Sequence, residues 1–166
     1  NGVAAITIII YSQFLLNTLY IGYSMGIAPI IGFNYGNKNT IQQKKVFQIS
    51  IQFITVVSSL IFIFSRFGGT NIIRLFVDGT SEVYQIAADG FTIFSYSFLF
   101  CGLNIFTSSM FTALSNGKVS AILSFLRTFG LLAGGILLLP KICGLTGIWL
   151  AVPVAEGIMF LVSAAC

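Results

Sequence analysis

Long apolar segments dominate this sequence and decide what the chain can fold into. Hydrophobic residues make up 57% of the 166 residues, and charged residues only 7%. A soluble domain carries about 25% charged residues, so this chain has too little polar surface to cover a core of its size. The composition excludes an ordinary soluble enzyme, a disordered chain and a typical nucleic-acid-binding protein. It predicts an all-α polytopic membrane protein.

Five apolar stretches are each long enough for a helix that crosses a bilayer, which takes about 20 mostly apolar residues. They do not alternate between polar and apolar residues, and they are too long for the strands of a membrane barrel. We therefore predict a single transmembrane domain over residues 1–166, a helix bundle with about five spans. The predicted spans are residues 2–32, 46–64, 83–114, 119–139 and 145–166.

Glycine and proline residues predict where these helices are interrupted. Gly68-Gly69 is expected to end the second helix, with a short interfacial helix to follow over residues 72–77. Pro140 is expected to close the fourth helix, because proline removes a backbone hydrogen bond. Both ends of the sequence also indicate a piece of a larger membrane protein, since Asn1 is not a Met and no polar tail precedes Cys166. One further helix upstream is consistent with an odd number of spans.

Basic residues predict the orientation of the chain in the membrane. Five spans place the two ends of the chain on opposite sides, and the loops around residues 34–45 and 115–119 on one side. Cytoplasmic loops carry an excess of Lys and Arg, so we predict a plasma-membrane protein with the Lys38 loop in the cytoplasm. The basic residues are Lys38, Lys44, Lys45 and Lys118 on this side, and Arg66, Arg74 and Lys141 on the other.

Polar side chains recur at helical spacing within the apolar spans, which places them on one face of each helix. Lipid offers these groups no partners, so the stripes are expected to face protein or water. Two interpretations stay open: hydrogen bonds between helices, or the wall of an aqueous cavity. The stripes are Gln13, Asn17, Tyr20 and Ser24; Gln48, Gln52, Thr55 and Ser59; Asp89, Thr92, Tyr96, Asn104 and Thr107; Ser120, Ser124 and Arg127; and Trp149, Pro153, Glu156 and Ser163.

Three ionisable residues lie within the predicted spans. A charge at the bilayer centre costs roughly 2.5–3.5 kcal/mol on insertion scales, so such a residue faces a partner or a cavity. Asp89 is either a solvated residue at a helix mouth or a cation site. Arg127 is interpreted as a structural charge that anchors to carbonyls or a carboxylate. Glu156 is either part of an ion pair or a coupling site, because loss of water favours the neutral carboxyl form that exchanges protons.

Several residue types that carry chemistry are missing from the sequence. It has no His, and its three Cys form no CxxC pair, so no metal site and no disulfide framework are predicted. It contains neither a phosphate-binding GxxxxGK[ST] motif nor a nucleophile–base set. No basic run is longer than Lys44-Lys45, which argues against a nucleic-acid partner. We therefore predict no enzyme activity and no cofactor.

Four groups of residues together resemble the multidrug and toxic compound extrusion (MATE) transporters. They are similar to the end of the second helix of a lobe, the outer segment that follows, a small-residue turn with its next helix, and the last helix hairpin. Their order and spacing agree across nearly all 166 residues, and the bacterial multidrug-efflux branch is the most similar. These residues are 26–36 (GIAPIIGFNYG), 71–78 (NIIRLFVD), 115–118 with 124–127 (SNGK, SFLR), and 139–140 with 144–156 (LP, GLTGIWLAVPVAE).

This resemblance implies a transporter of twelve helices in two lobes, of which the chain would be helices eight to twelve, the C-terminal lobe without its first helix. Family members export cationic, often aromatic, compounds in exchange for H⁺ or Na⁺, while the lobes rock around a central cavity. The implied partners are the lipid bilayer, an N-terminal lobe of the same chain and these small substrates. The expected cavity-lining residues are Gln13, Asn17, Tyr20, Tyr96 and Asn104, and the candidate cation or proton sites are Asp89 and Glu156.

Two alternative functions stay open at this point. Lipid-linked oligosaccharide flippases of a related superfamily have a similar number of helices. Their cavities would carry several cations for pyrophosphate, whereas Arg127 is the only cation inside the predicted spans. A non-transporting membrane scaffold or assembly subunit would use the polar stripes only for contacts between helices.

Overall fold

The computed structural model describes residues 2–74 and 76–165, without the side chain of Leu145. The described residues form helices joined by short turns, and no strand occurs among them. Five helical stretches in this part of the chain are long and apolar enough to cross a membrane. The predicted all-α class with about five spans is therefore confirmed. The five stretches are Gly2–Gly36, Thr40–Arg74, Glu82–Ala113, Gly117–Cys143 and Thr146–Ala165.

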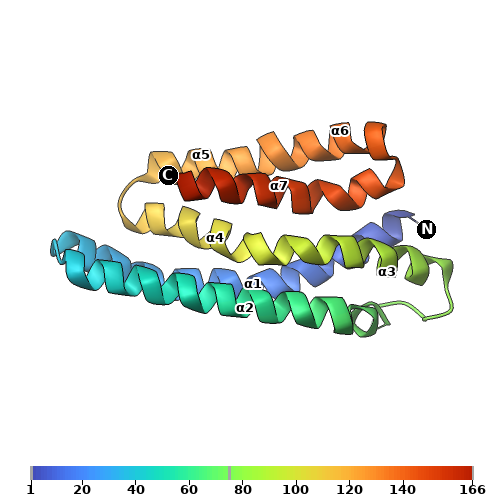
Figure 1. Ribbon diagram of the computed structural model, residues 1–166, viewed down its shortest axis with the longest axis horizontal. Coiled ribbons are helices and arrows are strands. Elements are labelled where there is room, and N and C mark those ends of the chain that lie inside the picture. Colours follow the sequence, from blue (N-terminus) through green and yellow to red (C-terminus); the bar gives the residue numbers. More distant parts are fainter. Residues whose placement is uncertain (1, 75, 166) are drawn as a thin grey trace.

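The helices pack in three layers (Figure 1). The hairpin of α1 and α2 forms one layer, the stretch from α3 to α4 lies in the middle, and the hairpin of α5–α6 and α7 forms the third. A 3₁₀ segment, η1, joins α3 to α4, and a π-helical segment, η2, joins α5 to α6. The elements are α1 (Gly2–Gly36), α2 (Thr40–Arg74), α3 (Glu82–Phe94), η1 (Ser95–Ser97), α4 (Phe98–Ala113), α5 (Gly117–Phe125), η2 (Leu126–Ala133), α6 (Gly134–Cys143) and α7 (Leu145–Ala165).

The connections gather at the two ends of the bundle (Figure 1). The turn after α1, the turn after α4 and the end of α7 lie at one end. The start of α1, the segment between α2 and α3, and the turn at Gly144 lie at the other. The loops around residues 34–45 and 115–119, which were predicted to lie on one side, therefore do share one end of the bundle. The cytoplasmic placement of that end stays a prediction.

The core lies where α1 and α2 meet the middle layer. Tyr20 of α1 is buried there, and its hydroxyl donates a hydrogen bond to the carbonyl oxygen of Phe98 at 3.1 Å. Its ring fits because position 102 is glycine: a Cβ on Gly102 would lie 2.6 Å from the ring. Phe91 and Phe98 belong to the same core as Tyr20, and their ring centroids lie 6.4 Å apart. Large rings packed against glycines thus bring these helices close together.

The expected break at Gly68-Gly69 is wrong, because α2 continues through both residues to Arg74. Gly69 serves packing instead: a Cβ there would lie 2.6 Å from the ring of Phe91. The expected interfacial helix over residues 72–77 is also absent from the described residues. Ile72 and Ile73 belong to α2, residues 76 and 77 follow its end, and residue 75 lies outside the described residues.

The expected end of the fourth span at Pro140 is wrong as well. α6 includes Pro140 and ends at Cys143, where Gly144 has a positive φ of 59° and donates its N–H to the Pro140 carbonyl at 3.0 Å. Proline is tolerated inside membrane-spanning helices because neighbouring groups satisfy the backbone it frees. The turn depends on glycine again at Gly147, where a Cβ would collide with the carbonyl of Leu139.

The predicted polar stripe of the second span lies on the outer side of α2. Gln48, Gln52 and Thr55 are exposed, whereas α2 buries Ser50 and Ser58 against its neighbours. Small hydroxyl residues permit close approach of helices, and the longer amides do not. Within this five-helix bundle, Gln48, Gln52 and Thr55 therefore do not pack against protein, and only Ser59 of this stripe is half-buried.

Candidate functional site

Within the third layer of the bundle, a buried ion pair connects η2 to α7. Arg127 from η2 donates two hydrogen bonds to one oxygen of Glu156 from α7, from Nε at 2.9 Å and from Nη2 at 2.6 Å. The Glu156 side chain is 6% exposed and that of Arg127 is 25% exposed. Charged hydrogen bonds of this kind are strong, and a desolvated pair keeps its strength because water does not screen it.

Asn104 of α4 holds the second oxygen of the same carboxylate. Its Nδ2 donates to Glu156 Oε2 at 2.7 Å and to the Glu156 backbone carbonyl at 3.0 Å. Ser163, two turns further along α7, donates to Asn104 Oδ1 at 3.2 Å. Both carboxylate oxygens thus accept hydrogen bonds, and the donors come from two different helical stretches.

A thiol extends these contacts to α1. Arg127 Nη2 also donates to Cys101 Sγ at 3.0 Å, and the Cys101 thiol donates to Asn17 Oδ1 at 3.3 Å. The result is one connected set of polar groups that links α1, α4, η2 and α7. We call it the polar network, and it consists of Asn17, Cys101, Asn104, Arg127, Glu156 and Ser163.

Arg127 lies in the π-helical segment η2 rather than in an α-helix. A π-helix bonds i to i+5, so it is wider than an α-helix and changes the direction of the side chains that follow; such segments are frequent at functional sites. Gly130 accommodates the wider turn, because a Cβ there would lie 2.8 Å from the Leu126 side chain. The backbone thus departs from regular geometry at the arginine of the ion pair.

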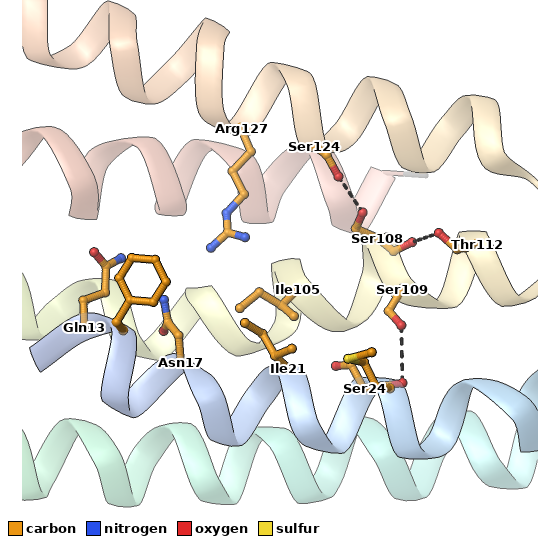
Figure 2. A pocket seen from close by; sticks show the side chains of 12 residues that line it. Gln13, Asn17, Ile21, Ser24, Ile105, Ser108, Ser109, Thr112, Ser124 and Arg127 are labelled. Atoms are coloured by element: carbon orange, nitrogen blue, oxygen red, sulfur yellow. Dashed lines mark hydrogen bonds between the residues drawn. The ribbon is translucent and has the colours of Figure 1, made fainter. Parts of the chain in front are cut away.

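A cavity of about 520 Å³ lies beside the polar network, between α1, α4 and the stretch from α5 to η2. Figure 2 shows Arg127 pointing into it from η2, toward Gln13 and Asn17 on α1. Arg127 is the only charged residue among those that line it. The rest of the wall combines amides and hydroxyls with the apolar side chains of Phe14, Ile21, Met25 and Ile105.

Hydroxyl groups line the half of the cavity away from Gln13 (Figure 2). Ser108 Oγ lies 2.8 Å from Ser124 Oγ, and Ser109 Oγ donates to the Ser24 carbonyl at 3.3 Å. The Ser24 hydroxyl is buried without a hydrogen-bond partner among the described residues. The cavity therefore offers neutral donors and acceptors next to apolar surface, a composition typical of sites for small organic molecules.

A family profile for MatE matches residues 1–133, four-fifths of the chain. This chain belongs to the MatE family. No curated protein and no solved structure matches it. MatE proteins are transporters rather than enzymes, and the five membrane-spanning helices make this chain an integral membrane protein in contact with the lipid bilayer. The match ends at Ala133, the last residue of η2, so Arg127 lies inside it and Glu156 lies beyond it.

In this MatE chain, five of the residues singled out from the sequence come together. Gln13, Asn17 and Arg127 all line the 520 Å³ cavity. Asn104 is buried at 3% exposure and binds Glu156. The interpretation of Arg127 as an anchor for a carboxylate agrees with its bonds to Glu156. The transport roles of these residues stay predictions.

Three other residues lie apart from the polar network of this MatE chain. Tyr20 is buried in the core and lines a separate apolar cavity of about 180 Å³ between α1 and α2. Tyr96 is 49% exposed, with its ring centroid 5.2 Å from that of Phe62. Asp89 is exposed on α3.

The expectation that Asp89 and Tyr96 share a face with Asn104 is wrong, and η1 explains why. A 3₁₀ segment has 3.0 residues per turn instead of 3.6, so it rotates α4 relative to α3. Asp89 precedes η1 and Tyr96 lies in it, and both are exposed. Asn104, which follows η1, is buried.

Sequence reasoning missed Cys101, because an isolated thiol in an apolar span is indistinguishable from a small hydrophobic residue. One signal was present: Cys101 precedes Asn104 by three residues and therefore shares its helix face. Among the described residues, no three of His, Cys, Asp and Glu gather as a metal site.

Proposed function

We propose that this chain is the C-terminal lobe of a secondary antiporter that exports small cationic or aromatic compounds in exchange for H⁺ or Na⁺. Its N-terminal lobe would supply the opposite wall of the substrate site, and the two lobes would alternate access to it. The observation that carries the proposal is a buried carboxylate, Glu156, held by donors from two helical stretches beside a cavity in a MatE member. The motif similarity to the bacterial multidrug-efflux branch supports the choice of substrates.

Glu156 is the coupling residue in this proposal. Its two oxygens already accept hydrogen bonds from Arg127 and Asn104. A proton or a sodium ion that reaches this carboxylate must therefore displace or share one of these donors. Because the donors belong to α4 and η2, occupancy by a cation would loosen contacts between helices. Such a link between ion binding and helix packing is what an antiporter requires.

The cavity wall supports small organic substrates over a pyrophosphate-linked cargo. A flippase for lipid-linked oligosaccharides needs several cations around its pyrophosphate, whereas Arg127 alone is charged among the lining residues, and Glu156 balances it. Aromatic compounds fit the combination of Phe14, Ile21 and Ile105 with the amides of Gln13 and Asn17.

The test is ethidium efflux from cells that express the intact transporter, with the proton gradient collapsed or sodium removed in turn. We expect efflux to stop under one of these conditions, which names the coupling ion. Absence of efflux in all conditions, from well-expressed protein, would contradict the proposal and favour the flippase or scaffold alternatives.

Substitutions test the place of coupling in the same assay. Glu156→Gln should abolish efflux when compared with wild type at equal amounts of folded protein, because the amide cannot exchange a proton or carry a charge. Asp89→Asn makes the same chemical change at an exposed residue outside the polar network, and we expect it to keep most of the efflux. Loss of efflux in Asp89→Asn alone would move the coupling site to α3.

A further inference from the structure

One end of the bundle is strongly basic. It carries the turns that connect α1 to α2 and α4 to α5 (Figure 1), and four lysines lie in or beside these turns. All four acidic residues of the chain lie elsewhere: Asp78, Glu82 and Asp89 towards the opposite end, and Glu156 in the polar network. In the part of the chain that the structure describes, no Asp or Glu side chain therefore lies at this basic end beside its lysines, Lys38, Lys44, Lys45 and Lys118.

A second cavity opens at the basic end. Its volume is about 380 Å³, and α1, α2 and α4 form its walls. It is separate from the 520 Å³ cavity, since the two share no lining residue. The residues that line it are Ile31, Thr40, Gln43, Lys44, Phe47 and Met110.

Polar and apolar groups are ordered along the wall of this second cavity. Thr40, Gln43 and Lys44 belong to the first turns of α2, next to the connection. Phe47 lies seven residues further along the helix than Thr40, which is roughly 10 Å deeper into the bundle. Its ring is held against Phe106, with centroids 6.2 Å apart. The cavity thus has a basic, hydrogen-bonding mouth and an apolar floor.

We propose that this cavity binds an anionic phospholipid. The Lys44 ammonium contacts the lipid phosphate, Thr40 and Gln43 hydrogen-bond its oxygens, and Phe47 with Met110 contacts the first part of an acyl chain. Charge complementarity carries the assignment, because basic pockets between spanning helices attract anionic headgroups. A bare anion would not use the apolar floor, and a zwitterionic lipid would gain less from the four lysines.

The experiment uses the intact transporter, purified in detergent. Dioleoylphosphatidylglycerol is titrated and its binding is followed by native mass spectrometry and by the shift in melting temperature. Dioleoylphosphatidylcholine, which has the same acyl chains, is the lipid control. We expect the anionic lipid to bind more tightly and to raise the melting temperature more than the zwitterionic lipid. Equal effects of the two lipids would overturn the proposal.

A pair of lysine variants locates the binding. Lys44→Gln should weaken phosphatidylglycerol binding about fivefold, the usual loss for one basic residue at an anionic surface. Lys45→Gln removes the same charge from the next residue, which does not line the cavity, and should weaken binding less than Lys44→Gln does. Equal losses in both variants would mean diffuse attraction to the basic end and would overturn the specific site.

Two further arms separate the lipid from other occupants. Met110→Trp fills the apolar floor and should weaken lipid binding while Lys44 remains. Inorganic phosphate at millimolar concentration should fail to compete with the lipid. Displacement of the lipid by phosphate alone would indicate a free-anion site, and absence of any lipid binding would indicate that another part of the transporter occupies the cavity. Either result would overturn the proposal.

Discussion

At the scale of the residue, the feature on which the proposed coupling depends is a buried ion pair between a carboxylate and a guanidinium. Glu156 is almost completely buried and its partner Arg127 is only partly exposed. Removing one member of a buried pair leaves an uncompensated charge, and this costs more than replacing both members. The pair therefore behaves as a unit, and a test of its role in transport must separate loss of folding from loss of function.

A double-mutant cycle makes that separation. We expect Arg127→Gln to destabilise the protein by about 3–5 kcal/mol, because the buried Glu156 side chain would lose its ion-pair partner and two of its hydrogen-bond donors. The double variant Arg127→Gln/Glu156→Gln should recover a large part of this loss, since two neutral amides then face each other. Thermal unfolding in detergent measures both effects. If the losses of the two single variants simply added, the ion pair would not hold these helices together.

The convergence of polar residues on this site was only partly predictable. Gln13 and Asn17 could be placed on one face of a regular helix because their spacing of four residues fits one turn. Asp89 and Tyr96 could not be placed from spacing, because η1 changes the number of residues per turn between them and Asn104. Nothing in the sequence marked η1 beforehand, since Ser-Tyr-Ser is compatible with an α-helix.

At the scale of the element, length and apolar character sufficed to predict five spanning helices. Their boundaries depended on glycines whose function the sequence does not reveal. Gly68-Gly69 and Gly144 are the same residue type, yet Gly69 packs inside a helix against Phe91, and Gly144 ends a helix with a positive φ. A tertiary contact decides between these two uses, so a glycine pair alone is weak evidence for a break.

One such glycine contact carries a prediction. A Cβ on Gly90 of α3 would lie 2.6 Å from the ring of Trp149 on α7, and this ring is buried. Gly90→Ala should therefore push α3 away from α7 and destabilise the protein by about 1–3 kcal/mol. Gly134→Ala in α6 is the control, since its Cβ would meet no atom within 4 Å.

Thermal unfolding of the two glycine variants gives the comparison. The control should be neutral or slightly stabilising, because alanine is the better helix former. Equal melting temperatures for the two variants would mean that α3 and α7 do not pack as closely as the structure shows.

At the scale of the whole molecule, the two ends of the bundle differ in charge. Lys38, Lys44, Lys45 and Lys118 gather at one end. Basic loops are retained in the cytoplasm during membrane insertion, so this asymmetry predicts the orientation of the chain. If that predicted orientation holds, the proposed lipid site lies in the cytoplasmic leaflet, where anionic lipids are enriched. A single topology experiment therefore tests an assumption that both arguments share.

Cysteine labelling from outside intact cells is that experiment. Asn37→Cys introduces a thiol in the turn after α1 without removing a lysine, and Thr80→Cys introduces one at the opposite end; both positions are exposed. Cys143 and Cys166 are replaced by Ser, while Cys101 is buried. A membrane-impermeant maleimide should label Thr80→Cys directly and Asn37→Cys only after permeabilisation. The reverse pattern would place the four lysines outside the cell, and the positive charge of this end would then have no role in orienting the chain.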